Sequence, residues 1–490
     1  MSFDKSPPEI VEKADITVNS DDDNRRLSQA SALHPNQDWT PAEEKALLRR
    51  IDLHIFPMLC AVFALSLLDR SNISAAYISG MKTDLHFNIG ARYSIALLVF
   101  FPAFALCQIP SNLIIRRLGA RTWLSFLITA FGVVVLGMGF VKSWIPMLVL
   151  RALLGAFEAG LLPGSIYMIA SWYKTFETAS RIAFFYTSAL VASGFGGILA
   201  YGLTSIHVGN GMYKQSWRWI YIIEGLMTIA VGIASFFTIG EFPEKARWLK
   251  PREAHIARMR ILNDRGEAEY KKVPLTQTLR LIRDPKLLLF CLQYFITSTS
   301  GYAIGYFFPI ILNEGIGFSY TTSLILTSPP YIFTIIASLG LAWLSDKIRM
   351  RWPIIVFQGS VAIAGYLLIL LPKIPGVRLF GVFLAVFGCQ SNAAAVVAYA
   401  QNQTVGTEKR SMLSALMVTA GAAGGVTGST IFRSQDAPLY LPGICVTLVT
   451  QLLLIVATFS MSMYLRRQNR LADEGKIGPL EGVEGFRYSP

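Results

Sequence analysis

The chain contains twelve apolar runs of about twenty residues, and this pattern constrains its fold more than any other feature. A helix of about 20 apolar residues matches the thickness of a bilayer, and repeated runs of that length are typical of polytopic membrane proteins. The sequence therefore predicts an all-α membrane protein with twelve transmembrane helices. We place them at residues 54–73, 92–115, 122–141, 144–169, 181–204, 217–240, 286–311, 321–344, 353–372, 377–400, 411–434 and 441–465.

The charged residues support this class and indicate an orientation. Only 15% of the 490 residues are charged, whereas a soluble domain averages about 25%. If both termini are cytosolic, the short inside loops and flanks hold sixteen lysines and arginines, against eight in the outside loops. Because cytosolic loops carry the excess of positive charge, we expect cytosolic termini. The net charge of +13 then reflects topology, and we expect no nucleic-acid partner.

The twelve runs divide into two sets of six around a long polar loop. The basic turn at 116–121 returns at 346–351, displaced by 230 residues, and Arg181 returns as Arg410, displaced by 229. Such parallel repeats place a substrate site near mid-membrane between the halves. We expect a disordered cytosolic tail with a surface helix (1–50), an N-terminal six-helix bundle (51–240), a cytosolic central loop (241–285), a C-terminal six-helix bundle (286–467) and a cytosolic tail (468–490).

Two pairs of charged residues lie inside apolar runs: Asp69 with Arg70 in the first, and Arg151 with Glu158 in the fourth. A charge at the bilayer centre costs roughly 2.5–3.5 kcal/mol, so such residues usually face a protein interior or a watery cavity. Arginine can hold a carboxylate with two parallel hydrogen bonds. A buried carboxylate can take up a proton. The pairs therefore indicate anion and proton chemistry. Two plainer interpretations stay open: Asp69–Arg70 marks the water-accessible outer end of the first helix, and Arg151–Glu158 is a structural ion pair.

Several uncharged polar residues in the second half are weaker candidates for the wall of a substrate site: Gln293, Tyr302, Ser391 and Asn392. A hydrogen-bonded contact between helices explains each of them equally well. Two glycine-rich motifs, SGFGG at 193–197 and GAAGG at 421–425, predict closely packed helix faces.

No catalytic or cofactor arrangement is visible in the sequence. The five cysteines lie in apolar runs without CxxC spacing or accompanying histidines, so we expect neither a disulfide framework nor a metal site. The chain has no phosphate-binding loop, which argues against transport driven by nucleotide hydrolysis. We therefore expect a protein that is not an enzyme and that needs no cofactor.

Six motifs in register resemble the major facilitator superfamily, and within it the anion:cation symporter branch. They are LDRSN (68–72), QIPSN (108–112), RALLGAFEAGLLPG (151–164), SWYKTFETASRIAFFY (171–186), WRWIYIIEG (217–225) and the pattern Asn402, Gly406, Lys409, Arg410. Within that branch the chain resembles fungal permeases of the allantoate and nicotinate type. The resemblance implies that helices 1 and 4 line a central cavity.

The resemblance also implies roles for particular residues. We expect Arg70 to anchor the substrate and Arg151 to act as its switching partner, with Asp69 and Glu158 as the protonatable carboxylates. Gating roles would fall to residues of the basic loops: Arg117, Arg121, Arg181, Asp346, Lys347 and Arg410.

The function expected from these features is secondary active transport: proton-coupled symport of a small organic anion, a carboxylate or vitamin-like molecule, by alternating access. We expect a monomer in the lipid bilayer of the plasma membrane, with an internal organelle membrane as the alternative. Two other functions stay open. One is export of a drug-like or secondary metabolite, and the other is a nutrient sensor that does not transport.

Overall fold

The computed structural model describes residues 39–206, 216–243, 246, 248–265, 284–348, 350–372, 374–404, 407–482 and 485–489. Residues 1–50 and 51–490 form separate compact units, and the architecture below is that of the second. Most of the expected disordered tail (1–38) and much of the expected central loop (266–283) lie outside the described residues.

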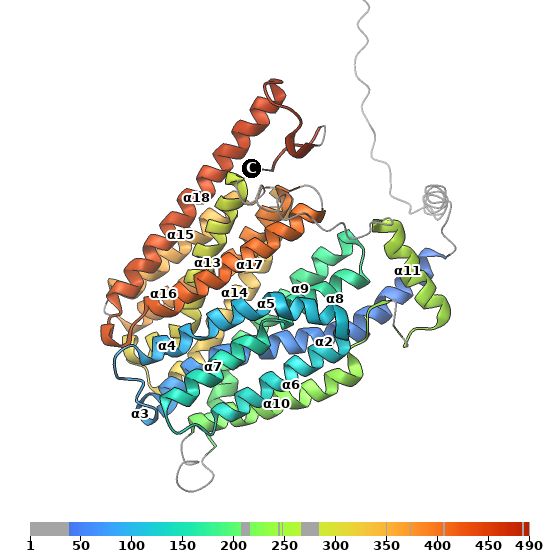
Figure 1. The fold of residues 1–490 in the computed structure, drawn as a ribbon. Helices are drawn as coiled ribbons and strands as arrows, with labels where there is room; N and C mark the ends of the chain where they lie inside the picture. The colour runs from blue at the N-terminus through green and yellow to red at the C-terminus, as the bar shows by residue number, and fades with distance from the viewer. Residues whose placement is uncertain are drawn as a thin grey trace, which may run out of the picture. The chain divides into compact units, whose positions relative to one another are not determined.

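Twelve helices within these ranges are long and apolar enough to cross a membrane, which confirms the predicted number (Figure 1). The first six spans form the N half. Its elements are α2 (Pro41–Ala76), η1 (Tyr77–Met81), α3 (Lys82–Asp84), α4 (Arg92–Leu98), α5 (Phe100–Leu118), α6 (Ala120–Met138), α7 (Trp144–Glu158), α8 (Leu161–Trp172), α9 (Thr175–Thr204) and α10 (Trp217–Thr238).

A polar helix, α11 (Pro251–Arg265), follows the N half, and the last six spans form the C half. The elements of the C half are α13 (Pro285–Ile310), η4 (Ile311–Ile316), α14 (Tyr320–Ile348), α15 (Trp352–Leu370), α16 (Pro375–Asn402), α17 (Thr407–Ile431), η5 (Ser434–Asp436), α18 (Leu441–Asp473) and η6 (Leu480–Gly482).

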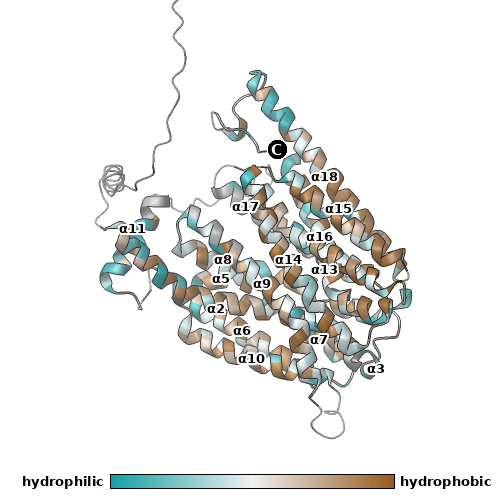
Figure 2. Ribbon diagram, turned by 180° about the vertical axis from the view of Figure 1, so that it is seen from behind, coloured by the Kyte–Doolittle hydropathy of each residue, from teal (hydrophilic) through white to brown (hydrophobic). Residues whose placement is uncertain are grey.

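Apolar residues predominate along the long helices of both halves (Figure 2). Leu106 on α5, Phe237 on α10 and Ile336 on α14 each expose more than two thirds of their surface. In water such a surface would be unfavourable, whereas lipid is as apolar as these side chains. The helices satisfy their own backbone hydrogen bonds, as a chain in lipid must.

The first helix differs from its prediction. The sequence predicts a surface helix followed by a separate span, whereas α2 is one helix from Pro41 to Ala76. Pro57 lies inside it and removes one backbone donor without ending the helix. Asp69 and Arg70 therefore lie more than one turn before the end of α2, and both are buried. They do not mark a water-exposed helix end.

Glycines set how closely several helices approach. A Cβ atom on Gly155 of α7 would lie 2.3 Å from the carbonyl oxygen of Phe100 on α5. A Cβ on Gly197 of α9 would lie 1.8 Å from Thr327 Oγ1 on α14, across the boundary between the halves. A Cβ on Gly425 of α17 would overlap the ring of Phe101 on α5. The last two contacts confirm that the SGFGG and GAAGG motifs are helix-packing faces.

The halves are joined by polar contacts at one end of the bundle, which we call the far end because it lies opposite the start of α13 and the end of α18. Glu314 of η4 forms an ion pair with Lys82 of α3 and accepts a hydrogen bond from Tyr440. The Ser94 hydroxyl donates to the carbonyl oxygen of Phe432 at 3.4 Å. The far end of the bundle is thus closed by contacts between α3, α4 and the C half.

The residues after α18 fold back onto the C half. Glu481 forms ion pairs with Lys286 at the start of α13 and with Lys409 of α17, the latter at 3.1 Å. The Ser489 amide donates to Gln403 Oε1 at 3.0 Å. Burial raises the pKa of the Glu481 carboxyl, but hydrogen bonds and positive charge from Lys286 more than offset this, so that the pKa lies below its ordinary value. The segment expected as a tail is therefore docked by a buried carboxylate.

We expect Glu481→Gln to release this segment, because the change leaves the buried Lys286 ammonium without its anionic partner. Cleavage by trypsin after Lys476 should become at least about tenfold faster. The matched control is Glu474→Gln, which alters only surface ion pairs with Arg470 and Lys476.

The same docking should depend on pH. Docking lowers the pKa of Glu481, so the stabilisation that its carboxylate gives to the docked segment is fully present above the ordinary glutamate pKa. That stabilisation is lost as the pH falls through the lowered pKa.

Equal cleavage rates in Glu481→Gln and the parent protein would show that the carboxylate does not hold the segment.

Candidate functional site

The centre of the bundle contains an ion pair between two spans. The Arg70 guanidinium on α2 bonds both carboxylate oxygens of Glu158 at the end of α7, with 3.4 Å from Nε to Oε2. The Ser66 hydroxyl, one turn earlier on α2, donates to Glu158 Oε1 at 2.6 Å. Arg70 and Glu158 are 8% and 2% exposed. The fork-shaped contact is the geometry in which arginine holds a carboxylate, here a carboxylate of the protein.

The C half reaches the same guanidinium. Arg70 Nη1 donates to the Tyr302 hydroxyl of α13 at 2.9 Å. On its other side the guanidinium lies over the Phe100 ring, 4.8 Å from its centroid, and 5.5 Å from that of Phe104. Aromatic faces stabilise a cation that has lost its water. Arg70 is therefore a buried cation that contacts both halves.

Arg151 lies beside this pair but does not bond Glu158. Its Nη1 donates to the backbone carbonyl oxygen of Arg70 at 3.4 Å, while its Nε and Nη2 have no hydrogen-bond partner. The Tyr221 hydroxyl of α10 faces the guanidinium. The two charges that lie seven residues apart on one helix face thus make separate contacts, and Glu158 pairs with the first helix instead. Arg151 keeps two buried donors available.

Asp69 points in another direction from its neighbour Arg70. Its Oδ2 accepts a hydrogen bond from Thr228 of α10 at 3.0 Å, and its carboxyl group lies within hydrogen-bonding reach of that of Glu224 on the same helix. Glu224 is not among the residues singled out from the sequence. The signal was present, because it is an acidic residue inside an apolar span, within the motif WRWIYIIEG.

The other predicted substrate residues lie away from this group. Gln293 of α13 is fully buried, and both of its side-chain polar atoms lack a hydrogen-bond partner. Ser391 and Asn392 of α16 donate to backbone carbonyl oxygens of their own helix, those of Phe387 and Gly388. Of the six predicted substrate-binding residues, Arg70, Arg151 and Tyr302 are brought together.

Several of the predicted gating residues make ion pairs or aromatic contacts away from the central site. Arg181 bonds both carboxylate oxygens of Asp52, at 2.8 and 2.9 Å, and its guanidinium lies over the Tyr173 ring. Arg121 lies over the ring of Phe236, and Lys347 over that of Trp343. Arg117 is exposed. The side chains of Asp346 and Arg410 lie outside the described part of the structure. Gating roles for these residues stay predictions.

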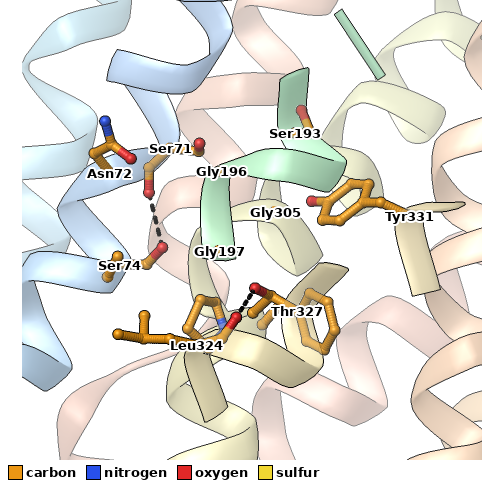
Figure 3. A pocket seen from close by; sticks show the side chains of 13 residues that line it. Ser71, Asn72, Ser74, Ser193, Gly196, Gly197, Gly305, Leu324, Thr327 and Tyr331 are labelled. Atoms are coloured by element: carbon orange, nitrogen blue, oxygen red, sulfur yellow. Dashed lines mark hydrogen bonds between the residues drawn. The ribbon is translucent and has the colours of Figure 1, made fainter. Parts of the chain in front are cut away.

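A small pocket lies on the far-end side of Arg70, between the halves (Figure 3). Ser71, Asn72 and Ser74 of α2 line it, and Tyr331 of α14 reaches across toward Gly305 of α13. The Asn72 amide nitrogen is buried and has no hydrogen-bond partner. The pocket therefore offers uncharged hydrogen-bonding groups next to the charged cluster.

Comparison with known proteins decides the family. Residues 59–429, more than half of the chain, match the profile of the Major Facilitator Superfamily. The chain belongs to the Major Facilitator Superfamily. This confirms the resemblance drawn from the six motifs, and it makes the protein a multi-pass membrane transporter and not an enzyme.

Relatives in fungi support the same family. The chain is 30% identical to the MFS-type transporter cnsO of Penicillium expansum, over 90% of this chain and 87% of the relative. It is 28% identical to the high-affinity nicotinic acid transporter of Saccharomyces cerevisiae, over 96% of this chain and 84% of the relative. Among solved structures, an inward-facing bacterial homologue of the human lysosomal transporter Spinster superposes with a TM-score of 0.67 at 16% identity. That superposition covers 87% of this chain and 98% of the other, and it supports the fold.

Proposed function

We propose that this transporter is a proton-coupled symporter of a small organic anion, working by alternating access at the plasma membrane with both termini in the cytosol. The observation that carries the proposal is the buried contact between Arg70 and Glu158. A guanidinium held by a carboxylate of the protein can exchange that partner for the carboxylate of a substrate. Protonation of Glu158 would release Arg70 for this exchange.

Electrostatics explains why proton and anion would move together. An anion that enters while Glu158 is ionised leaves a buried negative charge without a partner, which is strongly unfavourable. An anion that arrives with a proton keeps the group neutral, because Glu158 becomes neutral as Arg70 acquires its new partner. The coupling thus follows from charge balance around a single guanidinium.

Two further features support alternating access. Tyr302 of the C half bonds Arg70 of the N half, so a ligand bound to Arg70 would contact both halves. The far end of the bundle is closed by contacts such as Lys82 with Glu314. With the termini in the cytosol, as the positive-inside pattern predicts, this closed end faces outward, and the site would open to the cytosol.

Uptake by cells that overproduce the protein tests the proposal. A radiolabelled carboxylate would be offered at acidic and neutral external pH, with nicotinate first because one relative is a nicotinic acid transporter. Allantoate, pantothenate, short dicarboxylates and sugar acids would serve as competitors. We expect faster uptake at acidic pH and its loss when a protonophore collapses the gradient.

Three outcomes would count against the proposal. Uptake that ignores external pH and the protonophore would remove proton coupling. Accumulation of a metabolite in cells that lack the protein, together with less of it in the medium, would favour export. Normal uptake with a lost nutrient response in those cells would favour a sensor.

A further inference from the structure

Two carboxyl groups face one another in the N half, and the exchange at Arg70 uses neither of them. Asp69 on α2 and Glu224 on α10 are within hydrogen-bonding reach of each other. They are 1% and 0% exposed. Asp69 Oδ2 accepts a hydrogen bond from Thr228, one turn after Glu224 on α10, whereas Asp69 Oδ1 is buried without a donor. Both Glu224 oxygens are likewise buried without a donor. Among the described residues, the polar group that faces Glu224 is therefore the carboxyl group of Asp69.

Two ionised carboxylates buried side by side repel one another, and burial further disfavours both charges. The arrangement is satisfied when one proton lies between them, because a protonated carboxyl donates the hydrogen bond that the other accepts. The two groups then titrate as a pair, and the proton belongs to both.

The charges around Asp69 and Glu224 also indicate that the two carboxyl groups share one proton. Arg70 and Glu158 neutralise one another, which leaves Arg151 as a single positive charge beside Asp69. With one proton, Asp69 and Glu224 together carry a single negative charge, which balances Arg151. The buried cluster formed by these three residues and the Arg70–Glu158 pair is then neutral. With two protons Arg151 has no counter-charge, and with none the cluster carries an excess negative charge.

Among the described residues, the other titratable groups that face Arg151 or the carboxyl pair are tyrosines. Tyr221 of α10 faces both Arg151 and the carboxyl pair, while Tyr93 of α4 and Tyr306 of α13 face Arg151. As neutral phenols they add no charge and can donate hydrogen bonds. They leave the count of one proton unchanged.

Close packing holds Glu224 in place. A Cβ on Gly225, the next residue of α10, would lie 2.5 Å from the backbone nitrogen of Leu136 on α6. A Cβ on Gly132 of α6 would lie 2.8 Å from the backbone nitrogen of Ile229 on α10. Because α10 and α6 touch at the backbone, Glu224 has a rigid base from which to act on Asp69.

Asp69 is expected, beside Glu158, to be a second carboxylate that takes up and releases a proton during transport. We propose that Glu224 is a positioning residue that shares one proton with Asp69 and so sets how readily Asp69 exchanges that proton. The proposal rests on the proposed function only for its link to uptake. When the pair releases its proton to water, its charge changes from one negative to two. The unpartnered Nε and Nη2 donors of Arg151 are the nearby groups that can then bond it.

The test is Glu224→Gln, which keeps the shape of the side chain and removes its charge and proton. The amide would donate to an ionised Asp69, which alone balances Arg151, so Asp69 would keep its negative charge down to a lower pH. We expect the midpoint of the uptake-against-pH curve to move about one pH unit toward acid. Ser235→Ala is the control, since it removes a different buried hydrogen bond of α10, the one to Ser125 of α6, and should leave the midpoint in place.

A second measurement does not involve transport. Infrared spectra of the purified protein at neutral pH should contain the C=O stretch of a buried protonated carboxyl group. We expect the band in the parent protein and its loss in both Glu224→Gln and Asp69→Asn. Thermal unfolding and the amount of protein in the membrane show whether each variant is folded.

The outcomes separate the two proposals. If parent uptake depends on pH and Glu224→Gln has the same curve and retains the band, the shared proton is overturned while symport stands. If parent uptake ignores pH, symport fails, and the infrared band alone decides the shared proton: its presence supports the pair, and its absence overturns it.

Discussion

Replacing Arg70 with lysine is expected to lower the uptake of an anionic substrate at least about 100-fold, or about 2.7 kcal/mol of transition-state stabilisation. A lysine keeps the charge but presents a point-like ammonium, which cannot hold a carboxylate with two parallel bonds. It also lacks the planar group that lies over Phe100 and bonds Tyr302. Initial uptake rates, corrected for the amount of protein in the membrane, measure the effect.

The matched control is Arg92→Lys. Arg92 belongs to the same half and lies over the ring of Trp144, away from the central cluster. Its uptake should stay within about twofold of the parent rate, since exposed cation–π contacts contribute only about 0.5–1 kcal/mol. If Arg70→Lys transports as well as this control, Arg70 does not anchor the substrate.

Replacing Glu158 with glutamine is expected to abolish proton-driven accumulation while retaining exchange. The amide cannot take up or release a proton, so a pH gradient has no group at this position on which to act. Without a carboxylate, Arg70 lacks its partner and should hold the anion more tightly. In proteoliposomes, accumulation driven by a pH gradient should fall by about tenfold or more, whereas exchange of labelled for unlabelled substrate should continue.

Glu474→Gln provides the same substitution outside the membrane. Glu474 pairs with Arg470 and Lys476 at the surface and should have no effect on either reaction. Accumulation retained in Glu158→Gln would show that the proton is carried elsewhere. Loss of exchange together with accumulation would instead indicate a site that no longer binds substrate.

The sequence predicted the number of spans well because apolar length is a local property. A run of about twenty apolar residues must be satisfied by lipid or protein wherever it lies, so its position follows from composition alone. The helix boundaries are less local. Nothing at the start of the first span ends a helix, and α2 extends at both ends of the predicted run, from Pro41 to Ala76. That extension places Asp69 and Arg70 in the interior.

The sequence predicted most of the residues of the candidate site, but it did not predict which of them contact one another. Asp69, Arg70, Arg151 and Glu158 were identified because charges are rare in apolar spans. Two helical turns between Arg151 and Glu158 suggested a pair, yet Glu158 bonds Arg70, 88 positions earlier in the chain. Glu224 was passed over, and an acid in one span does not by itself show which residue of another helix it will meet.

The sequence by itself determined that this chain is a twelve-helix membrane transporter with buried acids and arginines in its first and fourth helices. Only the tertiary structure decided which charges meet: Arg70 with Glu158 and Tyr302, and Asp69 with Glu224. The physical reason is that a pairing between helices depends on their rotation and distance. Those are set by close contacts elsewhere, such as Gly155 against α5 and Gly225 against α6. A buried charged residue can be identified from the sequence of its own span, but the residue that it contacts depends on how all the helices pack.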